Sequence, residues 1–135
     1  MEYSLAIGLE KLRMPLLMAK VGNVELTFIF DTGATHNTIA SFVYEQLSTG
    51  FSLLEKDNKV MGIEGKYEGT PVVESVLYFA GVPILTEFSV VNINNAVIQI
   101  QNETGLQIHG FLGIPFLMEN KCVLDFEKKT ITINN

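Results

Sequence analysis

The chain has 135 residues, of which 47% are hydrophobic and 18% are charged, and its formal net charge at pH 7 is −6. This apolar content can supply a core without disulfides or metals, and we expect one domain over residues 1–135. The nine basic residues are scattered, which argues against nucleic acid as a partner because phosphate binding depends on clustered Lys and Arg. Cys122 is the only cysteine, so the chain cannot form an internal disulfide.

Neither an export signal nor a membrane segment is evident in the sequence. Residues 1–20 contain Glu2 and Glu10 and lack the basic stretch and following apolar segment that an export signal needs. The other apolar stretches are interrupted well before the roughly 20 residues of a membrane-spanning helix. We therefore expect a cytoplasmic protein without a membrane partner.

The first third of the chain predicts a hairpin followed by a helix. Residues 16–20 and 24–30 flank the Gly-containing residues 21–23, which is typical of a hairpin, and its second strand leads directly into Asp31. Residues 39–47 carry apolar side chains at helical spacing and are expected to form a short helix.

The middle of the chain contains a second hairpin and one ambiguous segment. Residues 72–79 and 83–91 are apolar, β-rich runs separated by three turn residues. Residues 94–104 contain apolar residues that suit a helix and others that suit a strand, so their structure stays open.

The last part of the chain predicts a strand, a helix and a final hairpin. Residues 108–112 form a short apolar run that ends at Gly113, and Pro115 then suits the first turn of a helix. Residues 123–126 and 130–133 flank a charged turn. The short strands and frequent turns predict an all-β fold. Five phenylalanines are expected in its core: Phe79, Phe88, Phe111, Phe116 and Phe126.

Asp31 stands at an unusual position for a charge, because it directly follows an apolar strand. Burying an ion without partners costs several kcal/mol or more, so this carboxylate needs either compensation or a function. Gly33 can bring its amide close to the carboxylate, and the Thr32 hydroxyl can bond locally. An Asp at this place can also simply begin a turn. The context is more specific, because glycines recur at Gly62 and Gly65 and an apolar-apolar-glycine motif follows at residues 111–113.

In this order the motifs resemble those of the retropepsin-like aspartic proteases, over about residues 16–133, and more the cellular, bacterial-type members than the viral ones. The resemblance implies a closed β-barrel with one or two short helices. It also implies that Asp31 is the catalytic acid and that residues 61–66 form a flap over the substrate. The other implied site residues are Thr32, Gly33 and Ala34 as support, Met61, Gly62, Ile63 and Gly65 in the flap, and Phe111, Leu112 and Gly113 beside the catalytic loop.

The family mechanism requires two carboxylates. Held about 3 Å apart, they cannot both ionise, so one acts as the base that activates water and the other acts as an acid. This chain offers one such loop, and a second Asp31 must therefore come from a second copy in a two-fold homodimer. The resemblance thus implies an endopeptidase that cleaves extended peptides without a metal or other cofactor, with Thr32 bonding the partner's backbone.

The sequence lacks an ion pair that belongs to the viral pattern. Viral members carry an Asp shortly after the catalytic loop and an Arg after the late glycine, and the two help to tie the dimer together. Here Thr35, His36 and Asn37 follow the loop and Ile114 follows the late glycine, so this ion pair is missing.

Other functional classes fit the sequence less well or stay open. Phosphatases and ATPases whose own aspartate becomes phosphorylated need Lys or a second Asp directly after that aspartate, and this chain has Thr32 there. His36, His109 and Cys122 lack the short paired spacings of zinc ligands. A catalytically silent peptide-binding or dimerisation module of the same fold stays open as the alternative.

Overall fold

The computed structural model describes the backbone of residues 1–61 and 67–134 and the side chains of residues 1–56 and 69–134. The strands are β1 Glu2–Ser4, β2 Leu16–Val21, β3 Val24–Phe30, β4 Thr38–Ala40, β5 Ser52–Met61, β6 Tyr67–Phe79, β7 Val82–Val91, β8 Gly110–Leu112, β9 Val123–Asp125 and β10 Thr130–Thr132. The helices are α1 Ser41–Gln46, α2 Asn94–Thr104 and α3 Ile114–Glu119, with a π-helical turn η1 Gly8–Leu12 and a 3₁₀ turn η2 Ser48–Gly50.

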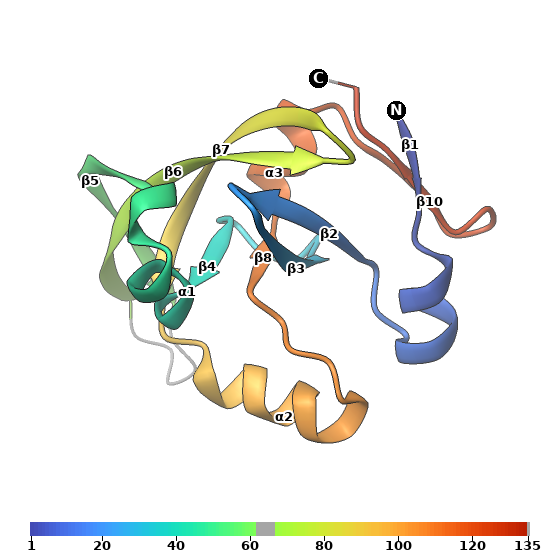
Figure 1. Cartoon of the computed structure of the whole chain (residues 1–135), viewed down its shortest axis with the longest axis horizontal. Helices are drawn as coiled ribbons and strands as arrows, with labels where there is room; N and C mark the ends of the chain where they lie inside the picture. Colours follow the sequence, from blue (N-terminus) through green and yellow to red (C-terminus); the bar gives the residue numbers. More distant parts are fainter. Residues whose placement is uncertain (62–66, 135) are drawn as a thin grey trace.

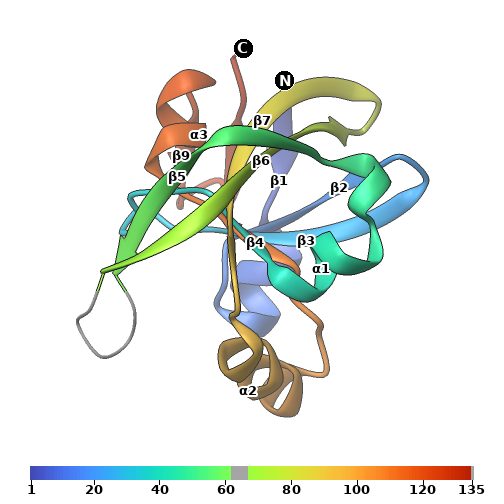
Figure 2. The same ribbon diagram turned by 90° about the vertical axis from the view of Figure 1, so that its left-hand side faces the viewer.

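Six strands close into a barrel (Figure 1). Their order is β2-β3-β8-β4-β7-β6, and the pairing of Lys20 with Tyr78 joins β6 back to β2. One further strand of the same sheet, β5, pairs with β6 and lies outside this ring (Figure 2). The predicted all-β closed barrel is therefore confirmed, and the described part of the chain contains three α-helices, more than the one or two expected.

The predicted hairpins form because their turn residues allow positive φ angles. Gly22, with φ of 59°, lies between β2 and β3, and Ala80 and Gly81, with φ of 48° and 85°, lie between β6 and β7. The β6–β7 turn has two successive positive φ angles and the β2–β3 turn has one, at its first turn residue, and both patterns suit the twist of antiparallel strands. Both hairpins agree with the sequence prediction, as does the strand that runs directly into Asp31.

Aromatic side chains fill the barrel. Phe28 and Phe88 are fully buried and their ring centroids lie 5.7 Å apart. Of the five phenylalanines expected in the core, Phe79, Phe88 and Phe116 are buried and Phe111 is partly buried. The prediction for Phe126 was wrong, because it lies in the turn after β9 and its side chain is 61% exposed.

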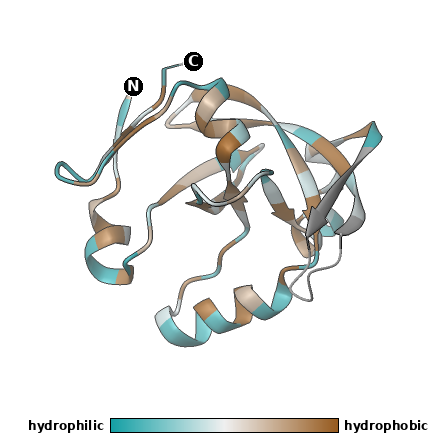
Figure 3. Ribbon diagram, turned by 180° about the vertical axis from the view of Figure 1, so that it is seen from behind, coloured by the Kyte–Doolittle hydropathy of each residue, from teal (hydrophilic) through white to brown (hydrophobic). Residues whose placement is uncertain are grey.

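The ambiguous segment is the helix α2. It ends at Gly105, whose φ of 76° permits the left-handed conformation that often terminates a helix. Only Val97 of this helix is buried, and both views show α2 lying apart from β5 and β6 (Figures 1 and 2). Hydrophilic residues cover much of α2, whereas hydrophobic residues follow the barrel strands (Figure 3).

The chain ends form a small separate sheet of three strands in the order β1-β10-β9. The sequence predicted the β9–β10 hairpin and missed β1, which adds to the free edge of β10. No helix in the described part of the chain is long and apolar enough to cross a membrane.

Candidate active site

The loop of residues 31–37, which the family resemblance implies to be the catalytic loop, begins where β3 ends beside β8. These two strands are parallel, with Phe30 paired to Leu112, and the Asp31 amide donates to the Leu112 carbonyl at 2.9 Å. Two motifs that lie far apart in the sequence therefore meet at one end of the barrel. This is the arrangement that the family resemblance implied for Asp31 and residues 111–113.

The carboxylate of Asp31 is held by its own loop. The Gly33 amide donates to Asp31 Oδ1 at 2.9 Å, as the sequence led us to expect, and the Ala34 amide donates to the Asp31 carbonyl at 3.1 Å. Within the described residues, Oδ2 of Asp31 has no hydrogen-bond partner. Asp31 is only partly buried in the single chain, so the cost of burying its charge is smaller than its position after an apolar strand suggested.

Thr32 and Ala34, on either side of Gly33, differ in their exposure and hydrogen bonds. The Thr32 side chain is exposed, and within the described part of the chain its hydroxyl does not form the local bond that we expected. The Ala34 carbonyl accepts a hydrogen bond from the Ile114 amide at 2.9 Å, which links the loop to the start of α3. The loop is therefore anchored on one side and open on the other.

Gly113 is required by a close approach of two backbone segments. A Cβ at this position would lie 2.6 Å from the Ala34 carbonyl oxygen and 2.7 Å from the His36 carbonyl oxygen. Such distances are well inside van der Waals contact, so only glycine fits without a shift of the loop. This explains in physical terms why the apolar-apolar-glycine motif ends in glycine.

Asn37 is a site residue that sequence reasoning mentioned only as a departure from the viral pattern. Its side chain is buried, and its Oδ1 accepts hydrogen bonds from the amides of Gly113 at 2.9 Å and Phe116 at 3.3 Å. The amide group donates from Nδ2 to the Glu87 carbonyl at 3.1 Å. The only sequence signal was an uncharged polar side chain next to an apolar strand.

Three other titratable side chains are of types that can bind metals: His36, His109 and Cys122. Nδ1 of His109 accepts a hydrogen bond from the Thr27 amide at 2.9 Å, and burial lowers the pKa of this imidazole. His36 is partly buried and contacts the Thr35 hydroxyl at 3.1 Å. Burial raises the pKa of the Cys122 thiol to about 11, so the thiol is largely protonated at neutral pH. The described residues contain no cluster of three potential metal ligands.

The predicted flap falls partly outside the described residues. Met61 ends β5 and pairs with Tyr67 at the start of β6, so these two strands lead into the predicted segment. Gly62, Ile63 and Gly65 lie outside the described residues.

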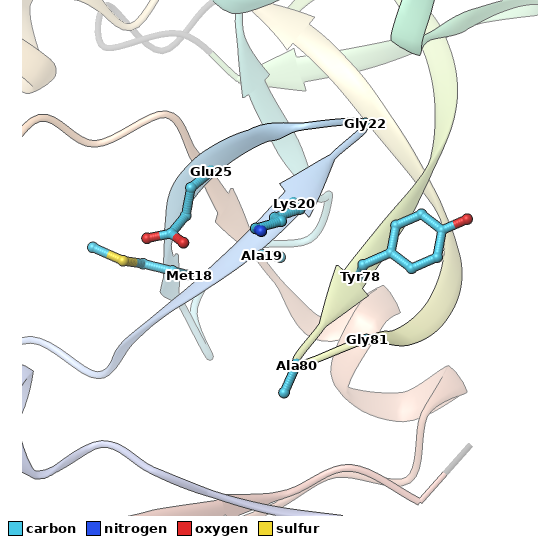
Figure 4. A pocket seen from close by; sticks show the side chains of 8 residues that line it. All are labelled: Met18, Ala19, Lys20, Gly22, Glu25, Tyr78, Ala80 and Gly81. Atoms are coloured by element: carbon cyan, nitrogen blue, oxygen red, sulfur yellow. The ribbon is translucent and has the colours of Figure 1, made fainter.

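A cavity of about 490 Å³ lies elsewhere, at the seam where β2 meets β6. Figure 4 shows Lys20 and Glu25 from the β2–β3 hairpin on one side and Tyr78 and Ala80 from the β6–β7 hairpin on the other. Asp31 does not line this cavity, which is therefore separate from the candidate active site.

Comparisons with known proteins agree with this geometry. A family model described as aspartyl protease matches residues 17–116, which include both Asp31 and Gly113. The retroviral protease-like domain of Ddi1 from Leishmania major has a TM-score of 0.59 and 15% identity, covering 90% of this chain and 87% of that one. The EIAV protease in complex with an inhibitor has a TM-score of 0.60 and 18% identity, covering 84% of this chain and 93% of that one. At these identities the two structures show a common fold. No curated protein sequence matches the chain.

Proposed function

The chain belongs to the aspartyl protease family, with a retropepsin-like fold, and on this premise we propose that it is an endopeptidase whose active site contains two Asp31 carboxylates, one from each subunit of a homodimer. The observation that supports the proposal most strongly is how Asp31 is held and exposed. Its backbone is tied to Leu112, one carboxylate oxygen is held by the Gly33 amide, and the side chain remains partly exposed at the end of the barrel.

The proposed chemistry is general acid and base catalysis. Two Asp31 carboxylates about 3 Å apart share one proton, because both cannot be charged at that distance. The ionised carboxylate takes a proton from a water molecule, and that water attacks the peptide carbonyl. The protonated carboxylate donates a hydrogen bond to the developing oxyanion. As the tetrahedral intermediate collapses, the C–N bond breaks and the carboxylate that took the proton from water returns it to the leaving nitrogen. The Gly33 amide, at 2.9 Å from Oδ1, fixes the orientation of each carboxylate.

The second carboxylate comes from a second copy, because the chain supplies one Asp-Thr-Gly loop. Thr32 is suited to this pairing, since its exposed side chain lies beside Asp31 and its hydroxyl has no partner within the described chain. In the proposed dimer this hydroxyl bonds the backbone of the facing loop. A single chain is then inactive, and activity depends on association.

The proposed substrate is an extended polypeptide. Strands β5 and β6 pair as far as Met61 and Tyr67, and we assign the segment between them as the flap that covers a bound peptide. The peptide binds as an added strand, with its side chains in alternating pockets. The family resemblance assigns Met61, Gly62, Ile63 and Gly65 to substrate binding, and Phe111 and Leu112 lie beside the Asp31 loop.

The test compares the wild type with Asp31→Asn on a mixed peptide library, from about pH 4 to about pH 7.5. The substitution removes the carboxylate and keeps the shape of the side chain. We expect cleavage by the wild type and none by the variant, with specific activity rising with protein concentration. A folded, dimeric wild type that is as silent as Asp31→Asn would instead indicate a peptide-binding or dimerisation module of the same fold.

A further inference from the structure

The first turn of α3 depends on the catalytic loop for its hydrogen bonds. A helix leaves its first amides without partners inside the helix, and a polar side chain at the N-cap commonly supplies one. Here the N-cap residue is Gly113, which has no side chain, and Pro115 has no amide hydrogen. The Ile114 amide donates to the Ala34 carbonyl, and the amides of Gly113 and Phe116 both donate to Asn37 Oδ1.

Asn37 thus caps α3 from 76 residues away in the sequence. The same side chain donates to the Glu87 carbonyl of β7, and the Asn37 carbonyl accepts from the Ser89 amide at 2.8 Å. The residue is only 5% exposed, so water cannot replace these bonds, and a buried amide that loses its partner is costly. One side chain therefore joins the catalytic loop, α3 and β7.

The two ends of the catalytic loop, residues 31–37, are attached to successive residues, Leu112 at the end of β8 and Gly113 directly after it. At its start the Asp31 amide is bonded to Leu112, and at its end Asn37 is bonded to Gly113. We propose that Asn37 fastens the end of the Asp31 loop to Gly113 and to the first turn of α3, and is thereby a positioning residue for Asp31. The inference rests on the proposed function, because it matters for catalysis only if Asp31 acts on a substrate.

The test uses Asn37→Ala, Asn37→Asp and a matched control, Asn120→Ala. Alanine removes every side-chain bond of Asn37, whereas aspartate keeps an acceptor oxygen for Gly113 and Phe116. Asn120 is also buried, at 6% exposure, and donates from Nδ2 to the Phe116 carbonyl at 2.9 Å. Asn120 therefore supports the opposite end of α3, and none of its side-chain bonds goes to the catalytic loop.

Two readouts separate positioning from stability. The first is the NMR signal of the Gly33 amide, which donates to Asp31 Oδ1, followed as Asp31 titrates; it needs no substrate. The second is the separate effect on kcat and KM for a peptide substrate. In Asn37→Ala we expect a shifted Gly33 titration and a loss of roughly 10²-fold in kcat, with a smaller change in KM. Asn37→Asp is expected to retain the wild-type Gly33 signal and most of kcat.

The control decides the interpretation. Asn120→Ala is expected to lower stability while leaving the Gly33 titration and kcat near wild type. Equal effects of Asn120→Ala and Asn37→Ala, or a folded Asn37→Ala with unchanged Gly33 titration and kcat, would overturn the proposal. If Asn37→Ala does not fold, the test uses Asn37→Asp alone. In that variant, when it is folded, a Gly33 amide signal that differs from the wild-type signal counts against the proposal. A wild type that cleaves nothing would refute the proposed function, and the Gly33 titration would still decide the role of Asn37.

Discussion

Replacing Gly113 with alanine tests whether the two loops of the site pack as closely as the structure shows. The new Cβ would lie 2.6 Å from the Ala34 carbonyl oxygen, and this gap must widen to about 3.4 Å for ordinary contact. Both close neighbours are backbone atoms, so no side chain can rotate away. Overpacking of this kind costs about 1–3 kcal/mol of unfolding free energy.

The same movement reaches the Asp31 carboxylate, which is catalytic in the proposed mechanism. Ala34 lies three residues after Asp31 and donates its amide to the Asp31 carbonyl, so a shift of Ala34 moves the Asp31 loop. A misplacement near 1 Å in a catalytic group lowers the rate by about 10²-fold. We therefore expect Gly113→Ala to lose both stability and kcat, measured by urea unfolding and by peptide cleavage.

The control for this substitution is Gly69→Ala in β6, where an added Cβ meets no atom within 4 Å. Its unfolding free energy should stay within about 0.5 kcal/mol of wild type. The reasoning is refuted if Gly113→Ala matches Gly69→Ala in both stability and cleavage, because the close approach at Gly113 would then not exist.

Three further predictions concern the rest of the molecule. Burial lowers the pKa of His109, so its contribution to the unfolding free energy is complete above the unfolded pKa of about 6.5 and is lost as pH falls below that value. His109→Asn keeps an acceptor for the Thr27 amide and should flatten the pH dependence of the unfolding free energy in this range, measured by urea unfolding. An unchanged pH dependence would contradict the lowered pKa. Phe28→Ala should cost about 3–5 kcal/mol in the same assay, because the ring is fully buried, and a loss below about 1 kcal/mol would show that the core is packed differently. Burial raises the pKa of the partly buried Cys122 to about 11, so it should react with iodoacetamide at pH 7.5 far more slowly than free cysteine, as followed by mass spectrometry. Labelling as fast as that of free cysteine would contradict the raised pKa.

The parts of the fold that could be predicted from sequence are those set by local chemistry. The β2–β3 and β6–β7 hairpins follow from apolar runs around Gly22 and around Ala80 and Gly81, whose backbone angles need no distant partner. The placement of Asp31 at the end of a strand is local in the same sense. Its proximity to residues 111–113 came from the family resemblance rather than from any periodicity.

The parts that could not be predicted depend on long-range pairing. The register of β5 breaks between Leu53 and Asp57, which disrupts the alternation by which a strand is identified. Segment 94–104 has apolar residues that suit either structure, and no local signal decided between them. The role of Asn37 depends on amides 76 and 79 residues away, so no local pattern could identify it.

The central claim is that one active site needs Asp31 from two chains, and mixing experiments test it most directly. Wild type and Asp31→Asn are combined at constant total protein, allowed to exchange subunits, and assayed for peptide cleavage. If both carboxylates are required, activity follows the square of the wild-type fraction, so an equal mixture retains about a quarter of full activity. Activity that instead falls in direct proportion, to about a half, would show that each chain works with its own Asp31 alone and would contradict the account.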